Sequence, residues 1–298
     1  MGSPAFALPS LRLLDEDFDV IGVVTQPDKP AGRGKQIKQS AVKVFSLSQN
    51  LFIMQPRRLK DQEFIENLRK LNPDVIVVAA FGQILPQAVL DLPEMGCINV
   101  HASLLPRWRG AAPIQAAILH GDQQTGVTIM KMDAGIDTGT ILSQKEVDIF
   151  IDDTSDSLSK RLAELGANLL VKVLPKYVRG DIQTQVQDDD FATYAIMIKK
   201  EDGLLNFQLT AKEIERKIRA YYPWPGAYTY FWEKLLKIHS AHISLSIGLK
   251  SGQRGVIEKK PVIGTKDGTI VLDEVQLAGK KSMKGEDFLM GARNWTLS

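Results

Sequence analysis

The sequence predicts an α/β protein in which a Rossmann-like, mostly parallel sheet is followed by a small all-β domain. Over the first 180 residues, short β-branched runs alternate with segments of helical periodicity, which indicates a parallel sheet covered on both faces. After residue 198 the chain changes to short strands separated by turn signals, which is typical of a barrel of the oligonucleotide-binding type. We therefore divide the chain into a first domain at 1–180, a linker at 181–198 without sustained periodicity, and a second domain at 199–298.

Helices separate the strands of the first domain. One begins behind Asp61 and must end before Pro73, because proline disfavours a helical conformation in the residue that precedes it. Another has Pro113 at its first position and Gly121 as its terminator. The short apolar runs between them predict five buried strands, at 20–24, 74–82, 97–100, 127–132 and 140–147.

A long amphipathic helix from Asp153 to Gly180 closes the first domain. The second domain opens with a helix at about 211–221, whose first turn carries Thr210 and Glu213 in the spacing of a capping box. Four strand-like segments follow, at 227–232, 235–245, 254–260 and 261–277, the last of them divided by a Lys-Asp-Gly turn.

Composition narrows the class of protein. An apolar share of 44% in 298 residues fits a globular protein with a well-buried core. The longest apolar stretches, such as 75–81, are far shorter than the roughly 20 residues that span a bilayer, and no secretory signal is visible at the N-terminus. The single cysteine, Cys97, excludes an internal disulfide framework and indicates a reducing compartment. We therefore expect a cytoplasmic protein without membrane contact.

Charge is spread unevenly along the chain. Residues 199–298 hold 17 Lys and Arg against 11 Asp and Glu, a balance of +6, whereas residues 1–198 have a balance of −4. Such asymmetry suggests that the second domain meets a polyanion. The alternative is a solvated surface that happens to be rich in lysine.

Asn99 and His101 end an apolar run and lie two residues apart, so their side chains project from the same face of one strand. They stand at its carboxyl end, where open α/β sheets place their ligand sites. An amide beside an imidazole suits acyl transfer, because the amide stabilises a developing oxyanion and the imidazole assists proton transfer. The alternative is a structural histidine beside an asparagine that caps the strand.

The loop at 132–139, with the sequence MDAGIDTG, offers Asp133 and Asp137 between two strands. Its glycines allow backbone conformations that bring a carboxylate close to another segment. A carboxylate within reach orients an imidazole or holds a water in the site. The alternative is an aspartate that forms the turn itself.

Taken together, these motifs resemble the formyltetrahydrofolate-dependent formyltransferases. NVHASLLPRWRGAAPIQ at 99–115 and GVTIMKMDAGIDTG at 126–139 carry the resemblance. Further segments extend it over nearly the whole chain, in particular toward the members that act on a charged tRNA: TQPDKPAGRGK (25–35), FGQILP (81–86), PWPGA (223–227) and GKKSM (279–283).

The resemblance implies roles for particular residues. Asn99, His101 and Asp137 match the family's catalytic trio. The implied folate contacts are Ser103, Leu104, Leu105 and Pro106 after the histidine, with Phe81, Gly82 and Ile84 in the loop that walls the pteridine. The implied tRNA contacts are Arg33, Lys29, Lys35 and Lys38, in a basic loop that enters the groove of the acceptor stem.

The resemblance also implies the reaction. A formyl group passes from 10-formyltetrahydrofolate, the folate co-substrate, to the α-amino group of methionine on initiator tRNA. We expect no metal, because His120, His239 and His242 have no cysteine or carboxylate partners at ligand spacing and each fits a structural role. We expect the protein to act as a monomer.

Residues 25–43 carry five basic side chains against the single acid Asp28. Their prolines and glycines predict a loop without regular structure, which contacts phosphates and so contributes salt-dependent affinity for RNA. The alternative is a solvated loop without a partner.

Family members begin with an apolar β-strand, and Met1 stands where that strand has just ended. We expect the natural start to lie upstream, since loss of a central strand would leave backbone groups and apolar faces unpaired. The alternative is a shortened protein that closes the gap.

Three functional classes stay open at this point: a tRNA formyltransferase, a formyltransferase or deformylase with a small substrate, and a non-catalytic RNA-binding protein. The basic loop and the β domain disfavour the second class, and the intact trio disfavours the third.

Overall fold

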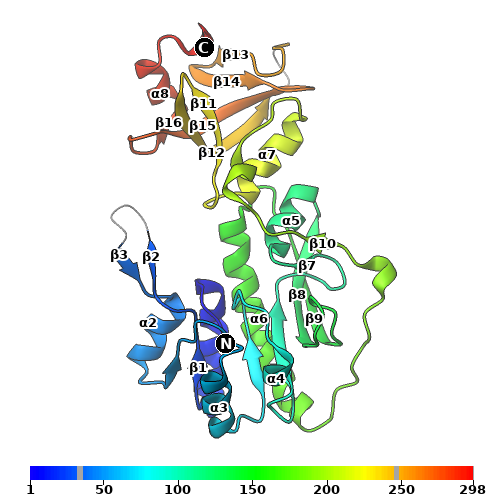
Figure 1. Ribbon diagram of the computed structural model, residues 1–298. Helices are drawn as coiled ribbons and strands as arrows, with labels where there is room; N and C mark the ends of the chain where they lie inside the picture. The colour runs from blue at the N-terminus through cyan, green and yellow to red at the C-terminus, as the bar shows by residue number, and fades with distance from the viewer. Residues whose placement is uncertain (32–35, 245–247, 298) are drawn as a thin grey trace. The chain divides into compact units, whose positions relative to one another are not determined.

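The computed structural model describes residues 1–31, 36–244 and 248–297, and the chain forms two compact units (Figure 1). The first unit contains residues 1–113, 124–148 and 159–195, and the second contains residues 114–123, 149–158 and 196–298. Within the described ranges, no helix is both long and apolar enough to cross a membrane.

Short strands and helices alternate through the first part of the chain. The strands are β1 (Val23–Val24), β2 (Lys29–Ala31), β3 (Gln36–Lys38), β4 (Ile53–Met54), β5 (Ile76–Val78), β6 (Cys97–His101), β7 (Arg109–Gly110), β8 (Gln124–Lys131), β9 (Ile141–Asp148) and β10 (Tyr194–Ala195). The helices are η1 (Ala5–Ala7), α1 (Leu8–Asp17), α2 (Ala41–Ser48), α3 (Gln62–Leu71), α4 (Gln87–Leu90), α5 (Pro113–His120), α6 (Ser155–Val178) and η2 (Asp189–Phe191).

The main sheet of the first unit has the strand order β5-β6-β8-β9. The pairing of β5 with β6 is parallel, as is that of β1 with β4, so the predicted α/β core is confirmed. The other half of the sheet is antiparallel, because β8 and β9 form a hairpin and β8 also runs opposite to β6. The alternation of strands and helices in the sequence does not reveal this reversal. The reversal depends on the direction in which the β8–β9 hairpin pairs with β6.

Helix α3 illustrates how local sequence fixes an element of this unit. Asp61 is its N-cap, and Phe64 and Leu68 are buried on its inner face. Asn72 ends it in the left-handed conformation, with φ of 49°, directly before Pro73. Both predicted boundaries of this helix are confirmed.

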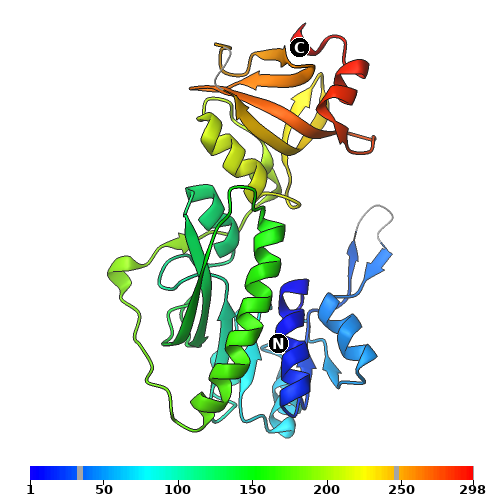
Figure 2. The ribbon, with the colours of Figure 1, turned by 180° about the vertical axis from the view of Figure 1, so that it is seen from behind.

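The two faces of β6 have different neighbours. Val100 is buried beside Gly166 of α6, where a β-carbon on the glycine would lie only 2.7 Å from Val100 Cγ1. Glycine therefore lets α6 lie directly against the strand (Figure 2). Because side chains alternate along a strand, Asn99 and His101 project from the opposite face.

The segment 25–43 departs from expectation. β2 and β3 pair as an antiparallel ribbon, with Lys29 opposite Lys38 and Pro30 opposite Ile37. The expectation of a loop without regular structure is wrong for these described residues. Both strands of an isolated two-stranded ribbon are edges, and an edge tolerates a proline that cannot donate a backbone hydrogen bond.

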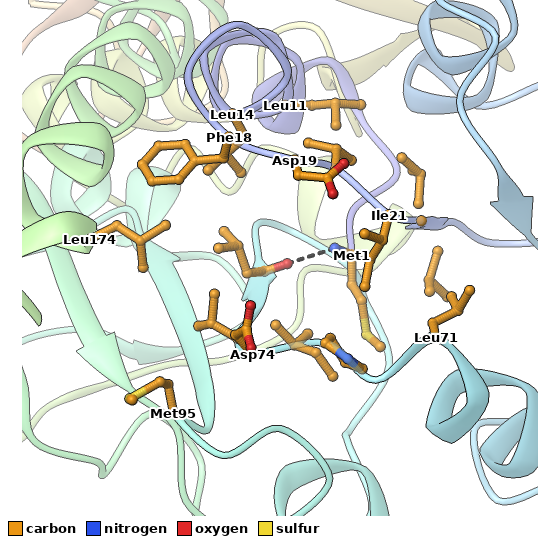
Figure 3. A pocket seen from close by; sticks show the side chains of 18 of the residues that line it. Met1, Leu11, Leu14, Phe18, Asp19, Ile21, Leu71, Asp74, Met95 and Leu174 are labelled. Carbon is orange, nitrogen blue, oxygen red and sulfur yellow. Dashed lines mark hydrogen bonds between the residues drawn. The ribbon is translucent and has the colours of Figure 1, made fainter. Parts of the chain in front are cut away.

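A groove of about 660 Å³ lies between β1 and β5 and is separate from Asn99 and His101. Much of its wall is apolar and comes from α1, α3 and α6, with Leu14, Phe18 and Leu174 pointing into it, and Asp19 and Asp74 also line it (Figure 3). The Met1 ammonium lines the groove and donates to Val77 O at 2.6 Å, and burial lowers its pKa to about 6.

Gly2 connects the two sides of this groove: it forms a parallel bridge with Ala79 and donates from its backbone N to Val24 O at 3.0 Å. An upstream start stays a prediction.

The second unit is a small β domain, as predicted. Its elements are η3 (Lys200–Gly203), α7 (Ala211–Ala220), β11 (Ala227–Phe231), β12 (Lys234–Ser244), β13 (Arg254–Ile257), β14 (Lys260–Gly264), β15 (Thr269–Leu277), β16 (Met283–Lys284), α8 (Gly285–Gly291) and η4 (Trp295–Leu297). The six strands form one antiparallel sheet of order β11-β12-β15-β14-β13, with β16 on β15.

The core of this unit is partly aromatic. Phe231, Phe288 and Trp295 pack with ring centroids 5.4 to 5.7 Å apart, and Trp295 Nε1 donates to Gly255 O at 2.8 Å. The capping box of Thr210 and Glu213 is confirmed at the start of α7. Strand β16 and helix α8 were not predicted, because each is short and lacks a clear periodic pattern.

Candidate functional site

Asn99 and His101 are fixed by the two neighbours of β6. Asn99 is in register with Val78 of β5 and Met130 of β8, and His101 with Thr128 of β8. Both side chains are nearly buried, with 9% of Asn99 and 5% of His101 exposed. The strand therefore holds an amide and an imidazole side by side on one face of the sheet.

Asp137 reaches this pair from the loop between β8 and β9. Asn99 Nδ2 donates to Asp137 Oδ1 at 3.3 Å, and Gly110 N donates to Asp137 Oδ2 at 2.8 Å. His101 Nδ1 lies 3.5 Å from the same Oδ2 atom. The structure thus brings together Asn99, His101 and Asp137, which we call the catalytic cluster below after the role that the sequence predicts.

His101 meets acceptors on both sides of its ring. Nδ1 faces the Asp137 carboxylate at 3.5 Å, and Nε2 lies 3.0 Å from Trp108 O. Because a carbonyl oxygen can only accept, Nε2 is the donor in the hydrogen bond with Trp108 O.

Asp133 has a different function from Asp137. Its Oδ1 accepts from Gly135 N at 3.0 Å and from Thr138 Oγ1 at 2.6 Å, within its own loop. It forms the turn, as the alternative interpretation of a loop aspartate proposes. Of the two aspartates, Asp137 is the one directed at β6.

The segment 103–106 follows the carboxyl end of β6, and hydrogen bonds fix its conformation. Ser103 is buried, and its Oγ donates to Arg107 O at 2.6 Å. Leu105 N donates to Thr128 Oγ1 at 3.1 Å, and Leu105 O accepts from Gln144 Nε2 at 2.8 Å. Leu104 and Pro106 are partly exposed, so these two present the segment's apolar surface.

The loop at 81–86 follows β5 and leaves the same edge of the sheet, because β5 and β6 are parallel neighbours. Phe81 is buried, and its carbonyl accepts from Gln26 Nε2 at 2.8 Å. Gly82 has φ of 77°, a conformation that favours glycine. Ile84 is 83% exposed and offers an apolar surface at this edge.

Of the predicted RNA-contacting residues, Lys29 and Lys38 lie on the β2–β3 ribbon and are exposed, whereas Arg33 and Lys35 lie outside the described residues. Lys29 Nζ donates to Gln26 Oε1 at 2.8 Å.

Lys43, which the charge count of this segment included, is engaged by the protein. Its Nζ donates to Asp28 Oδ2 at 2.6 Å. This hydrogen bond, followed by that from Gln55, holds the pKa of the Asp28 carboxyl below its usual value.

Each of the other histidines has a protein partner. His120 Nδ1 lies 3.0 Å from Ala116 O, His239 Nε2 lies 3.2 Å from Gln276 Oε1, and His242 Nδ1 lies 2.7 Å from Asp273 Oδ2. The part of the chain that the structure describes contains no group of three side chains suited to hold a metal ion.

Sequence reasoning missed two residues around the cluster. Arg109 is 1% exposed although it is charged, and Gln187 is 8% exposed although it lies in the segment interpreted as a linker. Gln187 Nε2 donates to Asp137 O in the loop at 132–139, which we call the catalytic loop below after the role predicted for Asp137. The sequence contains no signal for Gln187, because this contact joins positions 50 residues apart.

Comparison with known proteins gives consistent results. The family described as formyl transferase matches residues 7–174, and its C-terminal domain matches residues 197–293. A methionyl-tRNA formyltransferase of Citrifermentans bemidjiense is 46% identical over 297 residues, which cover 98% of this chain and 92% of that protein.

Solved structures share the fold. An N-formyltransferase from Helicobacter canadensis, in complex with folinic acid and dTDP-3-aminofucose, has a TM-score of 0.66 at 20% identity over 91% of this chain and 96% of its own. The methionyl-tRNA formyltransferase from Clostridium thermocellum has a TM-score of 0.53 at 20% identity over 82% of this chain and 92% of its own.

Proposed function

The chain belongs to the formyl transferase family, and from that premise we propose that it transfers the formyl group of 10-formyltetrahydrofolate to the α-amino group of methionine on initiator tRNA. The observation that carries the proposal is the convergence of Asn99, His101 and Asp137 on one face of β6. We place this reaction in the cytoplasm, where translation is initiated.

The reaction needs a neutral amine, an oxyanion site and a route for one proton. The amine nitrogen bonds to the formyl carbon, and negative charge develops on the formyl oxygen. Asn99 Nδ2 has a second hydrogen beyond the one it gives to Asp137, and His101 Nε2 is the neighbouring donor. In the free protein His101 Nε2 faces Trp108 O at 3.0 Å, and the developing oxyanion takes over this hydrogen bond.

Collapse of the tetrahedral intermediate breaks the bond between the formyl carbon and N10 of the folate. The proton that the amine loses must reach this nitrogen as it leaves. Asp137 is 16% exposed at its side chain and lies beside both other members, so it accepts the amine proton directly or through a water and passes it on. Removing a substrate proton and returning it to the leaving group keeps the protein unchanged over one turnover.

The folate-binding site that we propose lies between two loops at the same edge of the sheet. Ser103 to Pro106 and Phe81 to Ile84 leave the adjacent carboxyl ends of β6 and β5, where ligands of open α/β sheets bind. The exposed Ile84 and the partly exposed Leu104 supply apolar surface for a planar ring.

The tRNA contacts that we propose are electrostatic. Lys29 and Lys38 project from an exposed ribbon, Arg33 and Lys35 lie between them in the sequence, and residues 199–298 carry a balance of +6. Lysine contacts to phosphates release counterions and therefore supply affinity that falls as salt rises. A small acceptor such as an amino sugar needs neither feature.

An acceptor assay tests the proposal. Purified protein is mixed with 10-formyltetrahydrofolate and, in separate reactions, with charged initiator tRNA, free methionine and a dTDP-amino sugar. We expect rapid formylation of the charged tRNA and little of the other two. Preferential formylation of the sugar nucleotide would replace this proposal with a small-substrate enzyme, and tRNA binding without formylation would indicate a non-catalytic RNA-binding protein.

A matched pair of variants separates the catalytic histidine from the others. His101→Ala should abolish most of the activity, whereas His120→Ala, which removes a histidine that contacts Ala116 O in α5, should retain it.

A further inference from the structure

The segment 185–195, which we call the strap, pairs with two other segments of the first unit. At one end Gln185 and Ile141 exchange two backbone hydrogen bonds, of 2.8 and 2.9 Å. At the other end β10 pairs in parallel with β7. Figure 1 shows this segment as the extended stretch that follows α6 and passes alongside β7. The strap is therefore anchored by backbone pairing at two places.

Gln187 lies between these anchors and turns its side chain inward. Its Nε2 donates to Asp137 O at 2.8 Å and to Gly139 O at 2.7 Å, and its Oε1 accepts from Arg109 Nε at 3.0 Å. Only 8% of Gln187 is exposed, against 78% of its neighbour Val186. Both amide hydrogens and the amide oxygen are thus used, and two of the three bonds go to the loop that carries Asp137.

Asp137 needs such support because of its backbone. Its φ is 53°, in the left-handed region that residues with a β-carbon seldom adopt and that persists only where neighbouring structure fixes it. Gln187 holds the carbonyl of Asp137, while Gly110 N holds its carboxylate at 2.8 Å. The backbone and the carboxylate of Asp137 are therefore fixed separately.

Arg109 connects Gln187 and Gly110, the two residues that fix the backbone and the carboxylate of Asp137. It precedes Gly110 in β7, its Nε donates to Gln187, and its Nη2 lies 2.8 Å from Asp189 Oδ1 in the strap. Arg109 is 1% exposed, and a buried guanidinium that lost one of these partners would carry the cost of unmet hydrogen-bonding capacity. Arg109 therefore links β7 to the strap, and Gln187 links the strap to the catalytic loop.

We propose that Gln187 is a positioning residue for formyl transfer, which acts by holding Asp137 in register with Asn99 and His101. The inference rests on the proposed function, since it concerns the geometry of that same site. All polar atoms of the Gln187 side chain bind protein, so its effect on the reaction passes through the loop and not through a contact with substrate.

The test compares Gln187→Met with Gln185→Met. Methionine keeps the length of glutamine and removes its donors and acceptor, and Gln185 is the matched control because it lies in the same strap with an exposed side chain and contacts Ile141 through its backbone. We expect Gln187→Met to lower kcat by about 10- to 100-fold, the scale of a small misplacement of a catalytic group. The KM values for folate and charged tRNA should change less than about 3-fold in both variants.

A double variant separates positioning from a general loss of structure. In an Asp137→Asn background, Gln187→Met should lower kcat by no more than a further factor of about 2, because the group that it positions has lost its function. An equal loss with and without the Asp137 carboxylate would overturn the proposal, as would a kcat for Gln187→Met equal to that of Gln185→Met.

Gln187→Glu provides a second route if the methionine variant does not fold. Glutamate keeps an acceptor for Arg109 Nε and loses the two donors to the loop, so it should lower kcat. A Gln187→Glu protein with wild-type kcat would overturn the proposal. Wild-type protein that transfers no formyl group would instead overturn the proposed function, so the two failures are distinguishable.

Discussion

The catalytic cluster has two halves that are held in different ways. Asn99 and His101 lie on β6, where the backbone pairs with β5 and β8 and the alternation of the strand sets the direction of both side chains. Asp137 lies on a loop with a left-handed backbone, and contacts from Gly110 and Gln187 set its position. A strand positions side chains through its own ladder, whereas a loop depends on residues elsewhere in the chain.

The largest effect should follow loss of a side chain from the strand half. We expect His101→Ala to lower turnover by about 10²- to 10⁴-fold, the usual contribution of a general acid or base. The affinity for charged tRNA should change little, because this side chain acts on the reacting atoms. Steady-state kinetics and tRNA titration check both expectations, and near-normal turnover would return His101 to a structural role.

Loss of the loop carboxylate should have the next largest effect. Asp137→Asn keeps the size of the side chain, retains one oxygen for Asn99 Nδ2 or Gly110 N, and removes the negative charge that faces His101 Nδ1. We expect the single-turnover rate at saturating substrates to fall by about 10- to 10³-fold, somewhat less than for His101→Ala. A rate equal to that of the wild type would show that the strand half is sufficient alone.

A smaller effect, on binding alone, should follow changes of basic residues in the segment 29–38. Arg33→Ala should make the salt dependence of tRNA affinity shallower by about one unit if the residue contacts a phosphate, and the Lys29→Ala and Lys38→Ala variants should behave in the same way. The KM for folate should stay constant, since the proposed folate-binding site is formed by the loops at 81–84 and 103–106. Lys70→Ala, an exposed lysine near the end of α3, is the control. Unchanged affinity and slope in all three variants would remove the segment 29–38 from the proposed RNA site.

The smallest effect on turnover should come from the start of β6. Cys97 is 1% exposed, its thiol lies 3.7 Å from Val89 O, and burial raises its pKa to about 12. The thiol therefore is neither nucleophilic nor part of the cluster, and Cys97→Ala should change kcat by less than about 2-fold. A large loss of kcat in this variant would show that β6 transmits strain along its whole length.

The same thiol predicts a pH dependence of stability. Above pH 9 the unfolded state loses this proton, while the folded state keeps it up to about pH 12. Folding is therefore disfavoured as pH rises through this window, by about 1.4 kcal/mol per pH unit at most. Urea unfolding at pH 8 and pH 10.5 should show a larger loss of stability with pH for the wild type than for Cys97→Ala. Equal losses would contradict the raised pKa of the Cys97 thiol.

The sequence predicts the strand half of the cluster and its surroundings better than it predicts the contacts of the loop half. The strands around β6, the boundaries of α3 and the capping box of α7 were predictable, because each depends on residues close together in the chain. Asn99 and His101 share a strand face for the same reason. The bonds from Gln187 to the loop join positions 48 and 50 residues apart, and nothing in the local pattern indicates them.

Two further differences between the expected and the observed fold also arise from contacts between segments distant in the chain. The antiparallel docking of β8 on β6 depends on tertiary packing, which the alternation of strands and helices does not encode. The β2–β3 ribbon has a composition typical of a loop, and its pairing depends on two segments meeting edge to edge. Local propensity describes an element well and its partner poorly.

The central claim is that the strand half and the loop half act as one centre for formyl transfer. The most direct measurement is the single-turnover rate of formyl transfer from 10-formyltetrahydrofolate to initiator methionyl-tRNA for wild type, His101→Ala, Asp137→Asn and the double variant. Because groups that act as a unit are strongly non-additive, we expect the double variant to be about as slow as His101→Ala alone. A double variant slower by the product of the two single effects would contradict the claim and show two independent contributions.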